Sequence, residues 1–334
     1  MDNDVTKAIN KALDGGLLDA TEIGHLLAAE DLSEEAFAVQ RAGRLFASQL
    51  IDNKAEVHGQ IGLNTGLCPI DCKFCSFAKS ANVFPEPTKL SKEEAIEGVL
   101  SMERKGANAI YVMVTAHYPF DEFCDMAKAI HDAMETDVPM VANVGDFSAS
   151  QAQDLLDAGF TGVYHAIRMG EGEMTGVPIE RRMKSIEHAR EAGLLVGMCV
   201  EPVGPEHTVE ELVEKTLYTR DLEAVFSGSM RRTAIPQSSL YEYGQVSYLR
   251  MATIVAAVSL ATGTVVPGNC THEPNQLGAY AGANLVWAEV GSNPRDTEED
   301  TAASRGWTVD KCRDLFEECG WDVLDGPSVM FSKK

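Results

Sequence analysis

The segment SASQAQDLLDAGFTGVYHAIR, residues 148–168, contains one complete unit of the fold. Ser148 can cap a helix that carries the apolar side chains of Leu155 and Leu156, and Gly159 stands where such a helix ends. The apolar run at 162–167 has the length of a buried strand. The segment therefore predicts a helix, a tight turn and a strand in immediate succession.

The same alternation recurs along most of the chain. Apolar runs that predict strands, separated by amphipathic segments, occur at 57–63, 109–115, 138–144, 162–167, 194–200, 223–228, 264–269 and 284–290. Continuous apolar strands separated by helices are typical of a parallel sheet covered on both faces. This pattern favours an α/β fold, a (βα)8 barrel of the triosephosphate isomerase (TIM) type, with a doubly wound open sheet as the alternative.

The two ends of the chain differ from this pattern. Residues 1–55 predict an N-terminal helical cap, and residues 56–325 form the predicted barrel domain. The acidic stretch from Arg295 to Asp300 is interpreted as the exit from the barrel into a short C-terminal helical tail. A chain of 334 residues, 45% of them hydrophobic, is long enough for one large domain of this kind.

Net charge and hydropathy bear on whether the protein binds nucleic acid or membranes. A formal net charge of -23 argues against binding to nucleic acid or to an anionic membrane surface. The start, MDNDVTKAIN, lacks the features of a signal peptide, and we expect no apolar stretch of about 18 residues, the length that a membrane span needs. These features predict a cytoplasmic protein that acts on small molecules.

The cysteines point to a metal centre. The segment GLNTGLCPIDCKFCSF, residues 62–77, holds Cys68, Cys72 and Cys75, and a reducing cytoplasm favours metal binding over disulfides for such a set. The segment follows the first strand, so it falls on the face of the barrel that carries active sites. Three thiolates suit an iron–sulfur cube with one open iron. A structural zinc site completed by a distant ligand such as Cys270 is the alternative.

The spacing Cys68-x3-Cys72-x2-Cys75, with Phe74 before the third cysteine, resembles the signature of radical S-adenosylmethionine (SAM) enzymes. Residues 148–168, the segment RRMKSIEHAREAGLLVGMCVEPVG at 181–204 and AGANLVWAEV at 281–290 are similar to biotin synthase. The resemblance implies a 4Fe-4S cluster on the three cysteines, with SAM on the fourth iron. It also implies cleavage of SAM to a 5'-deoxyadenosyl radical that abstracts hydrogen from an unactivated carbon.

The same resemblance assigns residues to the cofactor. Arg182 falls at the family position that holds the SAM carboxylate, a role that suits an arginine fork. Arg168 and Glu171 are expected to face the ribose or amino group of SAM, although biotin synthase carries asparagine and aspartate there, and Glu173 is an alternative to Glu171. Thr115, and Phe74 in the cysteine segment, are expected beside the cofactor.

Other positions depart from biotin synthase. Val112, Val141 and Gly197 stand where the cysteines of its 2Fe-2S sulfur donor align, so the ligands of that cluster are missing. Tyr164, a candidate substrate-binding residue, and Ala166 replace asparagines that hold the dethiobiotin ring. Biotin formation by the familiar route is therefore not expected.

The substrate side offers other groups. Cys270 and His272, in GNCTHEP at 268–274, are expected just after the seventh strand as catalytic residues, and a second metal site, sulfur delivery and hydrogen donation are alternatives for them. Arg231 and Arg232 are candidates for holding a substrate carboxylate. Since adjacent strand residues face opposite ways, at least one of them is expected at the surface.

The sequence thus predicts a radical SAM enzyme that acts on a small substrate in cofactor biosynthesis. A low-potential flavodoxin or ferredoxin is the expected electron donor, and a homodimer is left open. The alternatives are an atypical sulfur-inserting biotin or lipoyl synthase, a methylornithine-synthase-like mutase and a hydrogenase-cofactor maturase. A zinc-stabilised barrel lyase is the alternative without radical chemistry.

Overall fold

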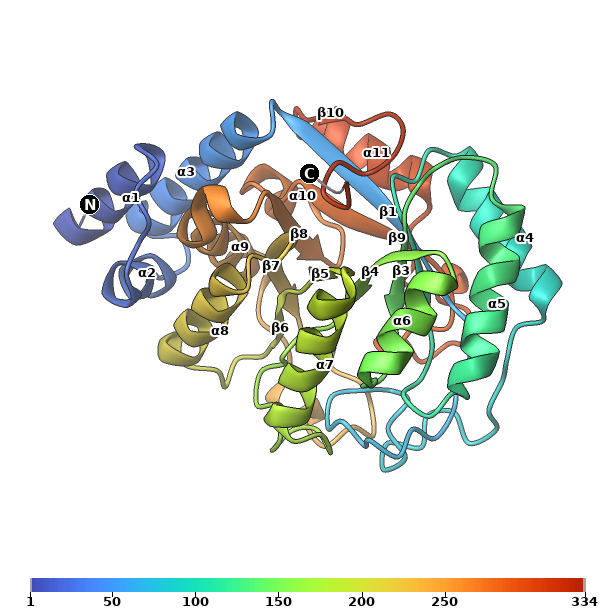
Figure 1. Ribbon diagram of the computed structural model, residues 1–334. Helices are drawn as coiled ribbons and strands as arrows, with labels where there is room; N and C mark the ends of the chain where they lie inside the picture. The colour runs from blue at the N-terminus through green and yellow to red at the C-terminus, as the bar shows by residue number, and fades with distance from the viewer. Residues whose placement is uncertain (1, 333–334) are drawn as a thin grey trace.

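The computed structural model describes residues 2–332 and forms a curled parallel sheet surrounded by helices (Figure 1). The strands are β1 (Lys54–Gly62), β2 (Ile110–Met113), β3 (Met140–Asn143), β4 (Phe160–Tyr164), β5 (Leu195–Gly197), β6 (Val200–Val203), β7 (Phe226–Arg231), β8 (Gly268–His272), β9 (Leu285–Gly291) and β10 (Asp322–Val323). The helices are α1 (Asn3–Leu13), α2 (Ala20–Leu27), α3 (Glu34–Leu50), α4 (Lys92–Arg104), α5 (Phe120–Ala133), α6 (Ala149–Asp157), α7 (Ile179–Ala192), α8 (Val209–Asp221), α9 (Tyr248–Thr262), α10 (Gln276–Tyr280) and α11 (Val309–Glu318).

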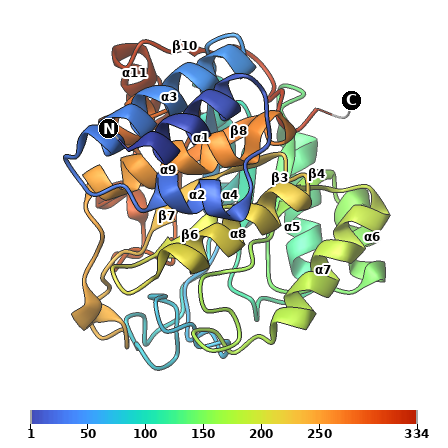
Figure 2. The ribbon, with the colours of Figure 1, turned by 90° about the vertical axis from the view of Figure 1, so that its left-hand side faces the viewer.

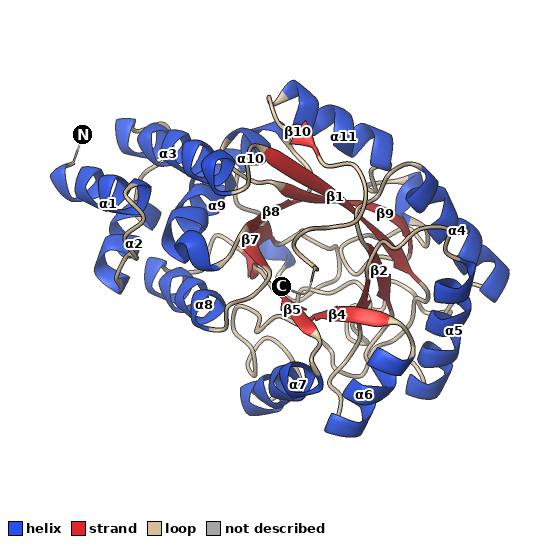
Figure 3. Cartoon of the chain, turned by 45° about the horizontal axis from the view of Figure 1, so that its top comes forward, coloured by secondary structure: helices blue, strands red, loops and turns tan. Residues whose placement is uncertain are grey.

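Strands β1 to β9 are parallel and lie in the order β5-β4-β3-β2-β1-β9-β8-β7-β6. The two end strands of this order, β5 and β6, are separated in the chain only by Met198 and Cys199. The backbone N–H of Val225 donates to the carbonyl of Val196 at 3.0 Å, which links β5 to the start of β7. The ends of the curled sheet therefore meet, and the predicted TIM-type fold is confirmed, with helices on its outside (Figure 3).

Local signals explain most of these elements. Ser91 with Glu94, and Ser148 with Gln151, form reciprocal capping boxes at the starts of α4 and α6. Gly193 ends α7 in the left-handed conformation, with φ of 88°. These helix ends are thus set by local residues.

Two predicted strands differ clearly from the structure, and one strand was not predicted. The strand expected at 194–200 is interrupted at Met198 and Cys199 and continues as β6. The strand expected at 264–269 begins only at Gly268, because residues 263–265 continue from α9 as a 3-10 turn. In the C-terminal tail, α11 is the expected helix, but the following strand β10 pairs with the start of β1 and was not expected.

The N-terminal helices α1, α2 and α3 pack on α8 and α9 at one side of the sheet (Figure 2). Leu26 of α2, Val39 of α3 and Ala256 of α9 belong to one buried apolar cluster. The helical content predicted for residues 1–55 is thus present, and its status as a separate domain stays a prediction.

Helix α9 is apolar on all sides. The segment Tyr248–Val265 has the length and composition of a membrane span, so the expectation that no stretch reaches this length is wrong. In the folded protein 72% of that segment is buried. Its apolar surface is covered by the N-terminal helices and by strand β7, which explains why a core helix carries so few charges.

Candidate active site

The cysteine segment lies in the long loop between β1 and α4, at the carboxyl ends of the strands (Figure 1). The Cys68 N–H donates to the Phe77 carbonyl at 2.7 Å, which closes the loop on itself. The Lys73 N–H donates to the Met174 carbonyl and the Ser76 N–H to the Pro294 carbonyl, each at 2.9 Å. The loop is therefore tied to the loops that follow β4 and β9.

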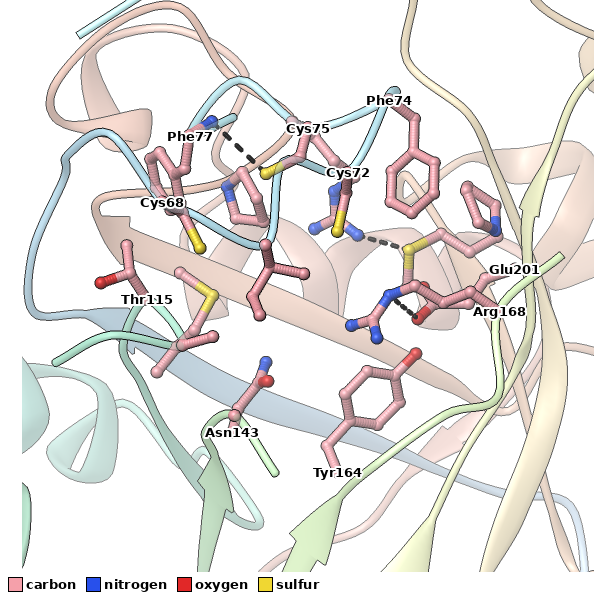
Figure 4. Close-up of a pocket in the computed structure, with 18 of the residues that line it drawn as sticks. Cys68, Cys72, Phe74, Cys75, Phe77, Thr115, Asn143, Tyr164, Arg168 and Glu201 are labelled. Atoms are coloured by element: carbon pink, nitrogen blue, oxygen red, sulfur yellow. Dashed lines mark hydrogen bonds and ion pairs between the residues drawn. The ribbon is translucent and has the colours of Figure 1, made fainter. Parts of the chain in front are cut away.

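Cys68, Cys72 and Cys75 line one cavity together with Phe74 (Figure 4). All three are free thiols, and the Phe77 N–H donates to the Cys75 sulfur at 3.3 Å. Burial raises the pKa of Cys72 to about 11 and raises that of Cys75 as well, so both need a cation to become thiolates.

The three thiols can serve as ligands of an iron–sulfur cluster. Within residues 2–332, no three His, Cys, Asp or Glu side chains come close enough together to hold one metal ion. A cube of iron and sulfide spreads its thiolate ligands farther apart than a single ion does. Three free thiols on one loop that face a common cavity suit such a cube.

Arg168 lines the cavity near the cysteines and faces Glu201 of β6 (Figure 4). The Arg168 Nε lies 3.8 Å from the Glu201 Oε1. Burial opposes the charge of Arg168, but Glu201 and then Glu171 outweigh it and raise the pKa of this guanidinium. The ion pair keeps Arg168 charged inside the cavity.

Arg182, in the first turn of α7, also lines the cavity and is 5% exposed. Its Nη1 lies 2.8 Å from the Asp146 Oδ1 and 3.2 Å from the His165 Nε2. Its Nε makes no hydrogen bond among the described residues, but it lies 3.7 Å from the Glu171 Oε2. Asp146 and His165 therefore hold one side of the guanidinium, and the Glu171 carboxylate faces the Nε on the other.

Glu171 and Glu173 do not line the cavity. The Glu171 carboxylate accepts from the Arg168 N–H at 2.9 Å and from the Thr175 hydroxyl at 2.6 Å, so it shapes the loop after β4. Glu173 is exposed. Thr115 lines the cavity, but its hydroxyl accepts from the Asn64 amide at 2.8 Å.

Of the residues expected on the substrate side, Tyr164, Arg232 and His272 line the cavity, but Cys270 and Arg231 do not. Cys270 lies inside β8 rather than after it, fully buried, because that strand starts later than expected. Its sulfur faces Cys199 instead of the cavity, at 2.8 Å.

The expectation that Arg231 or Arg232 is a surface charge is wrong. Arg231 stacks over the Tyr248 ring at 3.8 Å and pairs with Glu273 at 3.3 Å. Arg232 is 2% exposed, and its Nη2 donates to the Glu206 Oε2 at 2.9 Å. Each arginine pairs with its own carboxylate. The alternation of side chains along a strand does not predict these pairs.

The sequence interpretation missed a charged group beside the cavity. Arg295, taken for the exit from the barrel, lines the cavity and pairs with the buried Glu289 of β9. Arg305 pairs with the same carboxylate at 2.9 Å. A glutamate within a predicted buried strand was the available signal, because a buried carboxylate requires cations nearby.

The positions of a second cluster are filled by core residues. Val112 of β2 and Val141 of β3 are fully buried and apolar. Gly197 packs under the Phe226 ring, and a side chain there would overlap that ring. No support for a second metal site arises from these strands.

Comparison with known proteins agrees with this site. Residues 65–217 match the radical SAM superfamily, and the matched part includes all three cysteines. Among curated proteins it is similar to biotin synthase. It is 25% identical to that of Carboxydothermus hydrogenoformans over 232 residues, 67% of this chain and 70% of that protein. It is 29% identical to that of a Nocardioides species over 225 residues, 64% of this chain and 59% of that protein.

Solved structures share the fold. The FeFe-hydrogenase maturase HydG from Carboxydothermus hydrogenoformans superposes with a TM-score of 0.79 at 15% identity, covering 98% of this chain and 80% of that one. Methylornithine synthase (PylB) gives a TM-score of 0.79 at 15% identity, covering 97% of this chain and 98% of that one. At such identities these likenesses establish the TIM-type fold and leave the reaction open.

Proposed function

We propose that this protein is a radical SAM enzyme whose 4Fe-4S cluster is held by Cys68, Cys72 and Cys75. The observation that carries the proposal is that three free thiols and two arginines, the partly buried Arg168 and the buried Arg182, line one cavity at the carboxyl ends of the strands. When bound and reduced by one electron, such a cluster cleaves SAM to methionine and a 5'-deoxyadenosyl radical.

The residues of the chain serve to hold and enclose the cofactor. The guanidinium groups of Arg168 and Arg182 line the cavity and suit the carboxylate of SAM, and Phe74 offers an aromatic surface beside the cysteines. Thr115 and Glu171 act as supports, since their polar atoms are already engaged within the protein. The apolar walls exclude water, which a primary alkyl radical requires.

The substrate is a small molecule bound at the end of the cavity lined by Tyr164, Arg232 and His272. Cys270 and Arg231 act, on this proposal, only through these neighbours, because neither lines the cavity. Hydrogen abstraction without sulfur insertion is favoured, since the strand positions of a donor cluster hold Val112, Val141 and Gly197. We place the protein in the cytoplasm, with a low-potential flavodoxin or ferredoxin as the electron donor.

The test is anaerobic reconstitution with iron and sulfide, addition of dithionite and SAM, and measurement of 5'-deoxyadenosine with iron counted in the same sample. Wild type should bind about four irons per chain and form deoxyadenosine, and Cys72→Ala should form none. Cys124→Ala is the matched control, because this cysteine lies on α5 away from the cavity. A colourless protein that binds zinc and forms no deoxyadenosine would contradict the proposal.

A further inference from the structure

Two arginines share one buried carboxylate beside the cavity. The Glu289 carboxylate, 2% exposed, accepts from the Arg295 Nη2 at 2.6 Å through Oε1 and from the Arg305 Nη2 at 2.9 Å through Oε2. Glu201 also attracts Arg295, and Glu273 and Asp296 also attract Arg305, so the charges of this cluster are partly balanced by other carboxylates. Of the two arginines, only Arg295 lines the cavity.

His272 adds a second donor beside Arg295. The Arg295 Nη2 lies 2.7 Å from the His272 Nε2, and because a guanidinium only donates, that nitrogen must accept. Burial lowers the pKa of His272 to about 4, so the ring is neutral at pH 7 and carries its proton on Nδ1. The Glu289 Oε1, 3.3 Å from the same Nε2, is therefore joined to it through Arg295 and not by a direct hydrogen bond.

Both side chains have donors left over. Among the described residues, neither the Arg295 Nε nor the His272 Nδ1 has a hydrogen-bond partner, although both atoms are buried. The only acidic residue that lines this cavity within residues 2–332 is Glu201, which pairs with Arg168. Unpaired buried donors are costly, so these two groups await an acceptor that the described part of the protein does not supply.

We propose that Arg295 and His272 bind a carboxylate of the substrate in the cavity. This inference rests on the proposed function, because it names the class of its substrate. One guanidinium donor and one neutral imidazole donor match a monoanion better than a phosphate ester, which carries nearly two charges at pH 7. Met113, Met230 and Trp287 also line the cavity, so the remainder of the substrate is expected to be apolar or to carry an apolar chain.

Arg305 provides a matched control for Arg295. Both arginines pair with Glu289, and both are largely buried, with side chains 13% and 15% exposed. Removing either takes one positive charge from the cluster, but only Arg295→Gln removes a donor that lines the cavity. A contact with the ligand can therefore be separated from a general electrostatic effect.

The experiment measures binding of hexanoate and of hexanamide, its neutral isostere, by calorimetry to the full chain reconstituted with cluster and SAM. Wild type should bind hexanoate at least about tenfold more tightly than hexanamide. Arg295→Gln should lose this preference, and Arg305→Gln should keep most of it. Arg295→Lys, which keeps the charge and loses the fork, should retain part of it and serves if Arg295→Gln unfolds at a lower temperature than wild type.

Several results would overturn the proposal: equal affinity for acid and amide in wild type, no binding of either, an equal loss in both arginine variants, or tighter binding of hexyl phosphate. Iron content and deoxyadenosine are measured on the same samples. A hexanoate preference that depends on Arg295 in a protein that makes no deoxyadenosine would keep the carboxylate site and remove the radical function. Formation of deoxyadenosine without a preference for hexanoate would keep the radical function and remove the carboxylate site.

Discussion

The sulfur atoms of Cys199 and Cys270 lie 2.8 Å apart, although 71 positions separate these residues in the chain. Cys199 stands at the interruption between β5 and β6, and Cys270 lies in the middle of β8. Both are almost fully buried in the hydrophobic core of the barrel, and neither lines the cavity. They form a thiol pair that is separate from the cysteine loop.

This pair should form a disulfide under a small oxidant such as diamide. We expect a linked peptide containing Cys199 and Cys270 in mass spectrometry, formed slowly because burial raises the pKa of Cys199 and leaves little thiolate. Cys312 is equally buried but donates to the Trp287 carbonyl, so it should stay unlinked. If Cys199 links no more often to Cys270 than to Cys312, the pairing of these thiols is not a property of the native protein.

Placing a cysteine at position 197 should damage the barrel instead of creating a cluster ligand. The side chain of Gly197→Cys would overlap the Phe226 ring, which stacks with Tyr164 at a centroid distance of 6.0 Å. Overpacking of this kind costs about 1–3 kcal/mol of the free energy of unfolding. Chemical denaturation measures this loss.

Val141→Cys is the control for that measurement. Val141 lies in β3, is also fully buried and shrinks slightly on this exchange, so a smaller loss of about 1 kcal/mol is expected. Equal stability of Gly197→Cys and wild type would mean that Phe226 moves easily and that the core around Gly197 is not close-packed.

The units of helix, glycine and strand could be predicted because their signals are local. Ser91 with Glu94, and Ser148 with Gln151, act within one helical turn, and apolar runs mark the buried strands wherever they pair. The cysteine loop could also be found, since its spacing is confined to eight positions. The interruption at Cys199 has no such signal, because it depends on distant partners such as the Phe226 carbonyl, which accepts from the Met198 N–H at 3.4 Å.

The ion pairs around Glu289 could not be predicted for a related reason. Arg295 and Arg305 meet Glu289 only once the loop after β9 folds back, and an acidic stretch with arginines is usually a solvated surface. At least one of Arg231 and Arg232 was also expected at the surface. Both are instead paired with carboxylates, Glu273 and Glu206, that lie on other loops. Long-range ion pairs are set by the fold and leave little trace in local sequence.

Acid should destabilise the protein through its buried histidines. Burial lowers the pKa of His165 and of His272 from 6.5 to about 4, and it also lowers the pKa of His207. Below pH 6.5 the unfolded chain takes up protons that the buried rings do not. The free energy of unfolding should therefore fall between pH 6.5 and pH 4, by up to about 1.4 kcal/mol per pH unit for each such histidine, and should not change through these groups above pH 6.5.

His272→Gln isolates one of these contributions. Its free energy of unfolding should fall less steeply than that of wild type between pH 6.5 and pH 4.5, above the range in which most carboxylates titrate. Denaturation at three pH values in this interval measures the slope. Parallel slopes for wild type and variant would show that His272 takes up its proton in the folded protein.

Arg182→Lys should weaken the binding of SAM by about tenfold or more, because lysine cannot contact Asp146 and His165 and still present a donor to the cavity. Arg181→Lys is the matched control. Arg181 also approaches Asp146, at 3.4 Å, but its side chain is 62% exposed and does not line the cavity. Calorimetry with SAM on the reconstituted protein should show a loss for Arg182→Lys and near wild-type affinity for Arg181→Lys. Unchanged affinity in both would place the SAM carboxylate elsewhere, and Arg168 would then be the next residue to replace.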